Sequence, residues 1–452
     1  MRLLVCLFAC VLSAGGLWAQ PRRLTLPEAV RVALERNLTI RKAETQLELY
    51  EVQRRQRVAN FLPYVSANSS SGRNFGRQFD LTTGQLTDQR SDRLSASIDA
   101  SLNLFNGGAD WFGWRQAEQE LESQRAGLER ARQSVVFSVA QSFLQILLDQ
   151  ELLRIEQENL RAQRGQLERI EQLVRSGVRP QADLYAQQAQ VAQQELAVIE
   201  AENRLALDRA RLAQLLGLDS LEGLELVPPE ADPQMLEAES FELEALYRAA
   251  LASRSDYRQR QLALEAARTG LRAATAGYWP RLDLAFSYGS GYSSLARRFN
   301  PQTQRLEAIR FGDQFWRQNV YSSVGLRISI PIFDRLLTAN NVARNRVQYE
   351  YARWELQELE QNIRLELQQA LLNYQAAQKR WQVASAQLRA AEQALQAERE
   401  RYQVGSGTLL ELTTANTNYV RAASLQAQAR YSLLFQRKML DYYMGRSDLG
   451  VR

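Results

Sequence analysis

Two acidic residues follow glycine turns at matching places in the sequence, and they are the side chains best placed to do chemistry. Asp183 comes six residues after Gly177, and Glu411 comes six residues after Gly405. A carboxylate at the start of a helix can cap the backbone N–H groups of its first turn. Histidine is absent from the chain, which removes the usual general base and the commonest metal ligand. These acids therefore indicate helix capping or a charged surface rather than catalysis.

The sequence predicts no catalytic residue, no metal site and no cofactor. Both cysteines, Cys6 and Cys10, lie in the first 19 residues, so the remainder can form neither a disulfide nor a thiolate metal site. The chain carries no Gly-rich phosphate loop and no Gly-x-Ser-x-Gly elbow. Its 56 basic and 51 acidic residues alternate along predicted helix faces. That pattern favours solvated coiled coils over nucleic-acid binding.

The first 19 residues are predicted to be a signal peptide. Arg2 precedes an apolar run over residues 3–12, and Ala19 ends an A-x-A-like cleavage site. The run is shorter than the roughly 20 apolar residues of a spanning helix, and no later apolar run is long enough either. Lipidation at Cys10 is an alternative, although this cysteine comes early in the segment. The chain is therefore expected to be exported.

The remainder of the chain is duplicated. Residues 61–64 align with residues 278–281 at an offset of 217, and residues 104–106 align with residues 332–334 at an offset of 228. Internal self-similarity over such a distance predicts two copies of one structural unit. Each copy is predicted to contain a helix, a strand, a loop, a strand, a long helix, a turn and a return helix. The predicted repeats span 20–218 and 241–452, and a linker spans 219–240.

Apolar heptads run along the predicted long helices, at about 108–175 and about 335–403. Val139, Ile146 and Leu153, for example, are spaced by seven residues. Sustained heptads predict coiled-coil packing. Each long helix would extend about 100 Å, roughly twice the length of the single helix that opens each repeat or of the return helix. Two short helices end to end therefore match one long helix, as in the wall of a cylinder.

Four strands are predicted, at about 64–72, 93–105, 281–290 and 320–333. Alternation with a period of two gives these strands one polar and one apolar face. The polar face carries Ser97, Asp99, Ser101, Asn103, Arg327 and Ser329. The apolar face carries Ile98, Leu102, Leu326, Ile328 and Ile330.

The strand pattern favours an outer-membrane barrel over a soluble sheet with one buried face. Aromatic residues cluster at the strand ends, as in the girdles of membrane barrels. Every predicted helix already carries a heptad pattern, so none is left to cover the apolar face. Because four strands cannot close a barrel and lipid does not tolerate open edges, the chain should oligomerise. Three copies would give 12 strands, with the polar face lining the lumen and the apolar face contacting outer-membrane lipid.

These features together resemble the TolC-type outer-membrane efflux proteins. The resemblance rests on the duplication, the Leu-Pro-Glu-Ala of the first helix, the proline before each first strand, the segment 104–108 and the two glycine turns. It covers about residues 24–445. It implies a mainly α homotrimer with a 12-stranded membrane β-barrel that is continued by an α-helical periplasmic barrel. Such a protein resides in the outer membrane of a Gram-negative-type cell.

The resemblance also implies a function and partners. The chain would be a passive channel-tunnel in a tripartite efflux pump or a type I secretion system. Its partners would be a periplasmic adaptor (membrane fusion) protein and an inner-membrane pump or ABC exporter. An exported coiled-coil structural or adhesive surface protein is the alternative. The signal peptide and heptads fit that alternative equally well, but the apolar strand faces do not.

By the same resemblance, residues 175–184 and 403–412 form the periplasmic tip. The candidates for gating the aperture are Asp183, Glu411, Arg175 and Arg179. The candidates for docking the adaptor are the tip-turn residues Gly177, Leu184, Gly405 and Leu412. Thr414 stands where studied members of the family carry a second acid. Capping of the return helices by Asp183 and Glu411 is an equal alternative to gating.

Overall fold

The structure is a computed structural model that describes residues 22–80, 85–88, 90–228 and 241–443. The predicted signal peptide with Cys10 and residues 229–240 of the predicted linker lie outside the described residues. The chain divides into two compact units. Unit 1 holds Met1–Glu44, Leu128–Ser255 and Glu360–Arg452, and unit 2 holds Thr45–Gly127 and Asp256–Leu359.

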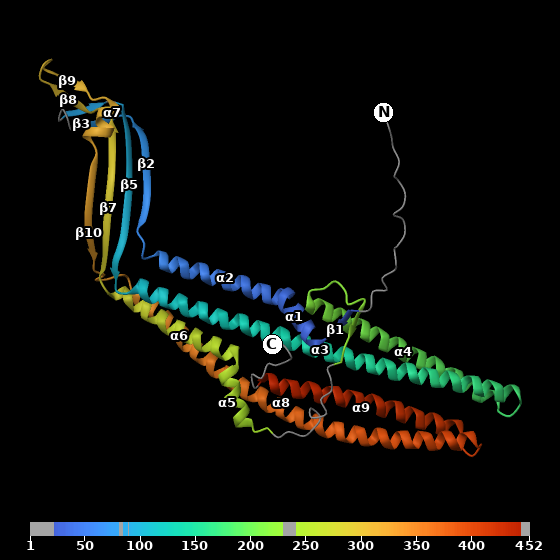
Figure 1. Cartoon of the computed structure of the whole chain (residues 1–452). Helices are drawn as coiled ribbons and strands as arrows, with labels where there is room; N and C mark the ends of the chain where they lie inside the picture. Colours follow the sequence, from blue (N-terminus) through green and yellow to red (C-terminus); the bar gives the residue numbers. More distant parts are fainter. Residues whose placement is uncertain (1–21, 81–84, 89, 229–240, 444–452) are drawn as a thin grey trace, which may run out of the picture. The chain divides into compact units, whose positions relative to one another are not determined.

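Helices make up most of the described chain, as predicted for the fold class. The long helices α3 (Ala109–Arg175) and α8 (Leu337–Gln403) have 67 residues each. Each is followed by an antiparallel return helix, α4 (Gln181–Leu216) or α9 (Leu409–Tyr443) (Figure 1). Among the described residues, no helix is both long and apolar enough to cross a membrane.

The helix that opens the first repeat is broken, which corrects the prediction of one continuous helix. Asn37 separates α1 (Leu26–Arg36) from α2 (Leu38–Ala59), and its backbone is extended, with φ −64° and ψ 129°. The Asn37 side chain donates to the Leu215 carbonyl over 2.8 Å and accepts from the Thr39 N–H over 2.8 Å. It therefore caps α2 and ties the break to the end of α4.

The second repeat is broken at the equivalent position. Arg254 follows Asn37 by the repeat offset of 217 residues and separates α5 (Leu243–Ser253) from α6 (Ser255–Thr275). Its side chain is buried, donates to Glu366 over 2.8 Å and lies over the ring of Tyr443. The two repeats thus share the break but stabilise it with different chemistry. A short 3₁₀ turn, Ala276–Tyr278, follows α6.

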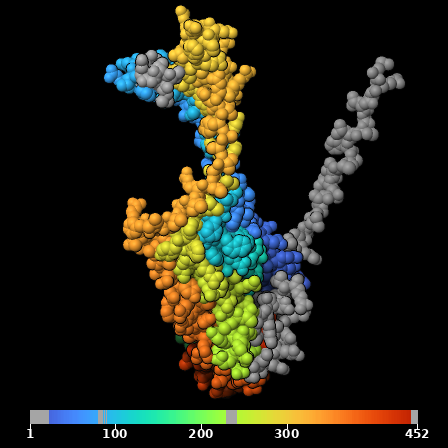
Figure 2. Space-filling model, turned by 90° about the vertical axis from the view of Figure 1, so that its left-hand side faces the viewer, coloured from blue at the N-terminus to red at the C-terminus, as the bar shows by residue number. Residues whose placement is uncertain are grey.

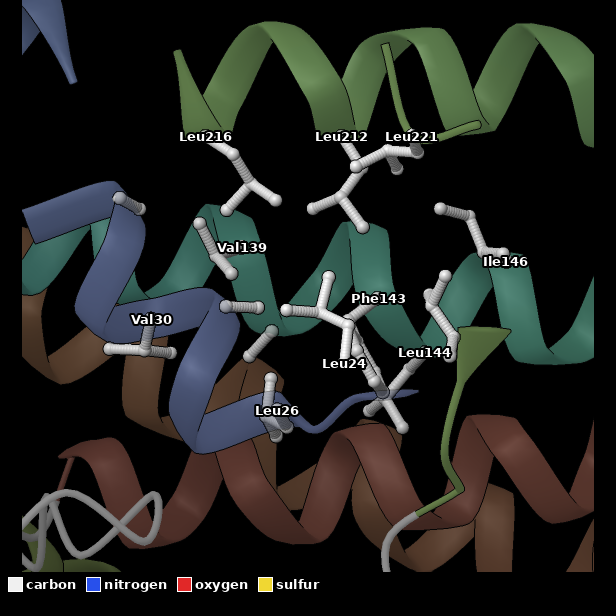
Figure 3. Packing of buried hydrophobic residues seen from close by; sticks show 14 of the residues in the cluster. Leu24, Leu26, Val30, Val139, Phe143, Leu144, Ile146, Leu212, Leu216 and Leu221 are labelled. Carbon is white, nitrogen blue, oxygen red and sulfur yellow. The ribbon is translucent and has the colours of Figure 1, made fainter. Parts of the chain in front are cut away.

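The hydrophobic core of unit 1 is built around the middle of α3. Val139, Phe143 and Ile146 are fully buried, and their spacing places them on one face of the helix. Figure 3 shows Leu212 and Leu216 of α4 pointing toward this face. Each such side chain contributes roughly 1.5–3 kcal/mol through removal from water. Packing against neighbouring helices therefore fixes α3 more firmly than helix propensity does.

A short parallel strand pair completes this core. β1 (Arg22–Leu24) pairs with β6 (Leu224–Leu226), with Leu24 opposite Leu226. Both leucines are buried in the cluster. The start of the first repeat is thereby joined to the segment that follows it. Sequence patterning does not reveal such three-residue strands, because they are too short to show a period.

A pair of buried carboxyl groups lies beside the same core. Asp149 on α3 is 2% exposed and Asp208 on α4 is 7% exposed. Burial, followed by the hydrogen bond and charge of Asp208, raises the pKa of Asp149 to about 6, against the opposing effects of the Gln145 hydrogen bond and the Arg204 charge. Gln145 donates to Asp149 over 3.1 Å, while Arg211 pairs with Asp208 over 2.6 Å. Two adjacent acids in low dielectric are stable when they share a proton.

Unit 2 contains a four-stranded antiparallel sheet in the order β10-β7-β5-β2. The strands are β2 (Tyr64–Asn74), β5 (Ser91–Asn106), β7 (Arg281–Ser293) and β10 (Tyr321–Ser329). Each repeat contributes one neighbouring pair, and β5 joins β7 at the centre. Strands β2 and β10 are the two edges, so each has a hydrogen-bonded neighbour on one side only within the described chain.

The fourth strand ends earlier than predicted. β10 stops at Ser329 rather than 333, so Ile330 does not belong to the strand. Pro331 follows and has no N–H to continue the ladder of hydrogen bonds. Ile330 therefore lies one residue beyond the strand, its side chain is 64% exposed, and its assignment to the lipid-facing surface stays a prediction.

Two small hairpins extend from the sheet at the end away from the helices of unit 2 (Figure 2). One is formed by β3 (Arg77–Asp80) and β4 (Gln85–Asp88). The other is formed by β8 (Arg297–Asn300) and β9 (Arg305–Ala308). A turn of α-helix, α7 (Phe311–Asp313), and a π-helical turn at Gln314–Gln318 lead into β10.

Candidate functional site

The two tips share one backbone design. Gly177 lies two residues after the end of α3 with φ +76°, and Gly405 lies two residues after the end of α8 with φ +80°. In each case the next N–H returns to a carbonyl five residues earlier, from Val178 to Leu173 over 2.9 Å and from Ser406 to Arg401 over 3.0 Å. This is the Schellman arrangement, which requires a left-handed residue and therefore favours glycine. The glycines close each hairpin so that its return helix can begin.

Arg179 connects the two tips within one chain. Its guanidinium lies 3.8 Å from the Asp183 carboxylate, four residues along in the same tip. The same guanidinium lies 5.0 Å from the ring centroid of Tyr402 at the end of α8. A cation above an aromatic face is attracted by the ring quadrupole. Asp183 is thus half-buried and ion-paired, and it is not the cap of α4, which is Pro180.

Glu411 has a different role in the second tip. Its carboxylate accepts from the Thr408 N–H over 2.8 Å and from the Thr408 hydroxyl over 2.9 Å, and its own N–H donates back to that hydroxyl. This is a capping box, so the capping interpretation holds for Glu411. Hydrogen bonds from the Thr408 backbone and hydroxyl, followed by the charge of Arg401, hold the pKa of Glu411 below its ordinary value. Glu411 therefore stays ionised.

The remaining tip candidates are placed as follows. Arg175 is 82% exposed and lies 4.0 Å from Glu171. Leu184 and Leu412 are half-buried in the first turns of the return helices. In the described chain neither Arg175 nor Arg179 forms an ion pair with Glu411. The hypothesis that they pair with Glu411 of a neighbouring copy stays a prediction.

One face of the sheet in unit 2 carries a polar network centred on Asp99. The Asp99 carboxylate accepts from Asn68 over 3.0 Å, from Ser97 over 2.7 Å and from Ser287 over 2.7 Å. Further along the same face, Asn103 donates to Asp283 over 3.0 Å, and Asp283 is opposite Arg327. Ser101 and Ser329 continue the same alternation. The polar residues predicted to line a lumen are therefore brought to one face.

The opposite face is apolar and uncovered in a single chain. Ile98, Leu326 and Ile328 are 49%, 66% and 67% exposed. Their cross-strand partners, Tyr288, Leu284 and Leu282, are aromatic or aliphatic. Leu102 lies on the same face opposite Leu284. A contiguous exposed apolar surface of this kind marks contact with lipid or with another protein.

Comparison with known families identifies the chain. The family model described as "Outer membrane efflux protein" matches residues 29–218 and 246–446, which is most of both repeats. The chain belongs to the outer membrane efflux protein family. The family places this efflux protein in the outer membrane as a passive export channel, rather than as an adhesive surface protein.

Individual relatives agree with this assignment. The efflux protein is 27% identical over 366 residues to the pyoverdine export outer membrane protein OpmQ of Pseudomonas putida, covering 77% of this chain and 71% of OpmQ. It is 23% identical over 359 residues to outer membrane protein TolC of Escherichia coli, covering 78% and 70%. The fold matches the outer membrane protein VceC of Vibrio cholerae with a TM-score of 0.77 at 18% identity, covering 93% and 96%.

The structure of this efflux protein also shows buried polar residues near the tips that the heptad pattern does not predict. Asn159 of α3 donates to Gln194 of α4 and accepts from Asn416 of α9, and all three are buried. One turn closer to the tip, Gln187 donates to Gln163 over 2.7 Å. These residues share a helix face that was not the predicted heptad row. Asn159 and Gln163 are four residues apart on α3, and this spacing is the sequence pattern that could have indicated a shared polar face.

Proposed function

We propose that three copies of this efflux protein assemble into one outer-membrane conduit, a 12-stranded barrel that is continued by helices into the periplasm. The observation that carries the proposal is the sheet of unit 2, whose edges β2 and β10 have no outer partner in the described chain and whose apolar face is exposed. Lipid does not tolerate open edges, and four strands are too few for a closed barrel. Pairing of β2 with β10 of the next copy would satisfy both edges.

The assembly is tested by its mass. Native mass measurement of the detergent-solubilised protein is expected to give three chains per particle, because three four-stranded sheets supply 12 strands. The particle should persist at high salt, since strand pairing and apolar contact are screened far less than surface ion pairs. A monomeric mass in mild detergent would exclude the shared barrel.

The conduit is proposed to act with a periplasmic adaptor (membrane fusion) protein and an inner-membrane pump or ABC exporter. Exposed apolar side chains at both tips support an adaptor contact here: Val178 is 67%, Val404 79% and Leu410 76% exposed. Monomeric soluble surfaces rarely leave such residues clustered at turns without a partner. The pump could belong to a tripartite efflux system or a type I secretion system.

The tips are proposed to form the aperture that gates the conduit. In a trimer, Asp183 and Glu411 would place up to six carboxylates around one axis. A ring of acids favours cations through its local potential. Arg179, which is paired with Asp183 and stacked on Tyr402, would hold the two tips of each chain in the closed arrangement. Each such pair contributes only about 0–1 kcal/mol, but three act on one opening.

Single-channel recording in planar bilayers tests the gating role. Glu411→Gln is expected to reduce cation selectivity while keeping the cap, because glutamine also completes a capping box with Thr408. Thr408→Ala is the matched control, since it removes the two hydrogen bonds of the capping hydroxyl and keeps the charge of Glu411. Arg179→Ala is expected to raise the open probability, and Asp183→Asn to lower cation selectivity. If all three charge variants keep the cation selectivity and open probability of the wild type, the acids have structural roles only and the gating proposal is wrong.

A further inference from the structure

A polar cavity of about 370 Å³ lies close to the tips in unit 1, lined by residues of α3, α4, α8 and α9. Three arginines line it, Arg161 and Arg169 from α3 and Arg399 from α8. The lining residues of the described chain include no aspartate or glutamate. A cavity lined by several cations and no anion has a positive local potential, which attracts anions.

Two buried hydrogen-bond donors line the same cavity without a partner in the described chain. They are the Gln166 Nε2 group and the Tyr402 hydroxyl. Tyr402 is 6% exposed, and its ring is held by the Arg179 guanidinium. Buried polar atoms in native proteins are nearly always hydrogen-bonded, so unpartnered donors indicate a missing acceptor. Gln163 and Gln187, which also line the cavity, already bond to each other.

Some arginines of α3 and α8 are held by ion pairs, unlike the three that line the cavity. Arg154 and Arg164 on α3 are ion-paired with carboxylates, and so is Arg401 on α8. Among the described residues, no ion pair or hydrogen bond joins Arg161, Arg169 or Arg399 to any other side chain. All three are exposed, so they can move their guanidinium groups toward a ligand at the mouth of the cavity.

We propose that this cavity binds a small oxyanion of the phosphate or carboxylate class. The Tyr402 hydroxyl and the Gln166 amide donate to its oxygens from the buried side, and the arginines neutralise its charge from the mouth. Guanidinium groups match the geometry of phosphate and carboxylate oxygens. Because α3 and α8 both contribute, the anion ties one helical hairpin to the other. All lining residues come from one chain, so the site requires neither the trimer nor the gating role.

Isothermal titration calorimetry on the detergent-solubilised full-length protein tests the site. Inorganic phosphate and citrate are titrated separately, with sodium chloride at matched ionic strength as the reference. We expect saturable binding of one anion per chain for phosphate, citrate or both. Tyr402→Phe removes one buried donor and is expected to weaken binding about tenfold, the effect of one hydrogen bond to a charged group. Loss of both Arg169 and Arg399 to glutamine is expected to weaken binding further.

Arg164→Gln is the matched control, because Arg164 is on the same helix but pairs with Glu195 and does not line the cavity. This variant is expected to bind as the wild type does. Absence of saturable binding would mean that water alone occupies the cavity, and the proposal would fail. Equal binding by wild type and Tyr402→Phe, or equal weakening by Arg164→Gln, would also overturn it by showing a diffuse surface effect.

Discussion

Arginine in place of Ile328 is expected to destabilise the folded barrel by roughly 2–4 kcal/mol per copy if the position is near the bilayer midplane. Ile328 is 67% exposed, pairs with Leu282 across the sheet and lies on the apolar face. A guanidinium at this position would either lie in the hydrocarbon or require water to enter the bilayer, and both are energetically costly. The change is best measured as the urea concentration needed to unfold the protein in bilayers.

Ser329→Arg is the matched comparison, since it places the same side chain one residue away on the opposite face. The polar face already accepts Arg327, so this variant is expected to change the urea midpoint little. The duplication makes Asp99 the equivalent of Arg327, which is consistent with a charged lumen at that level. Equal losses in the two variants would show that the faces are assigned wrongly.

Asp149→Asn is expected to stabilise unit 1 at pH 7.5 by about 1–3 kcal/mol, because the raised pKa of Asp149 means that its ionised form is unfavourable in the folded state. Asp149 has a pKa of about 6 in the folded state, above its ordinary value of 3.8, so the folded state binds the proton more tightly. Stability should therefore decrease as the pH rises from about 4 to about 6 and stay level above it. Asparagine keeps the bond from Gln145 and donates to Asp208.

Thermal unfolding followed by circular dichroism, in detergent at a series of pH values, measures this effect as the difference between variant and wild type. The difference should be near zero below pH 4 and reach its maximum above pH 6. Glu158→Gln is a suitable control, because Glu158 is an exposed acid on the same helix, paired with Arg154. A pH-independent difference for Asp149→Asn would mean that the two aspartates do not share a proton.

Much of this architecture could be predicted because its signals are local. The capping box at Thr25, the alternation in β5 and the glycines at the tips each depend on neighbouring residues. The break at Asn37 could not be predicted in this way. The Asn37 side chain is held by the Leu215 carbonyl, 178 residues away, and the sequence around Asn37 does not indicate that hydrogen bond. Arg254 is likewise fixed by Glu366, on a distant helix.

The tip was predicted in position but not in detail for the same reason. Gly177 and Gly405 mark the turns, and Glu411 was correctly considered as a capping residue. Tyr402 was not among the residues predicted to act at the tip. Its contact with Arg179 and its unpartnered hydroxyl arise from helices that meet only in the folded chain. A heptad pattern predicts which face of a helix a residue occupies, but it does not predict which polar atoms on that face lack a hydrogen-bond partner.

The order in which parts of the chain can fold during export follows from where the core of unit 1 lies in the sequence. Every buried member of that cluster lies between Leu24 and Leu226, so the first repeat can bury it before the second repeat has crossed the inner membrane. β1 emerges early, but it cannot pair until β6 has emerged, about 200 residues later. β5, by contrast, can pair with β2 at once, and its other edge stays open until β7 emerges. During that interval an apolar strand edge is exposed in the periplasm, where holding chaperones would have their main task on this protein.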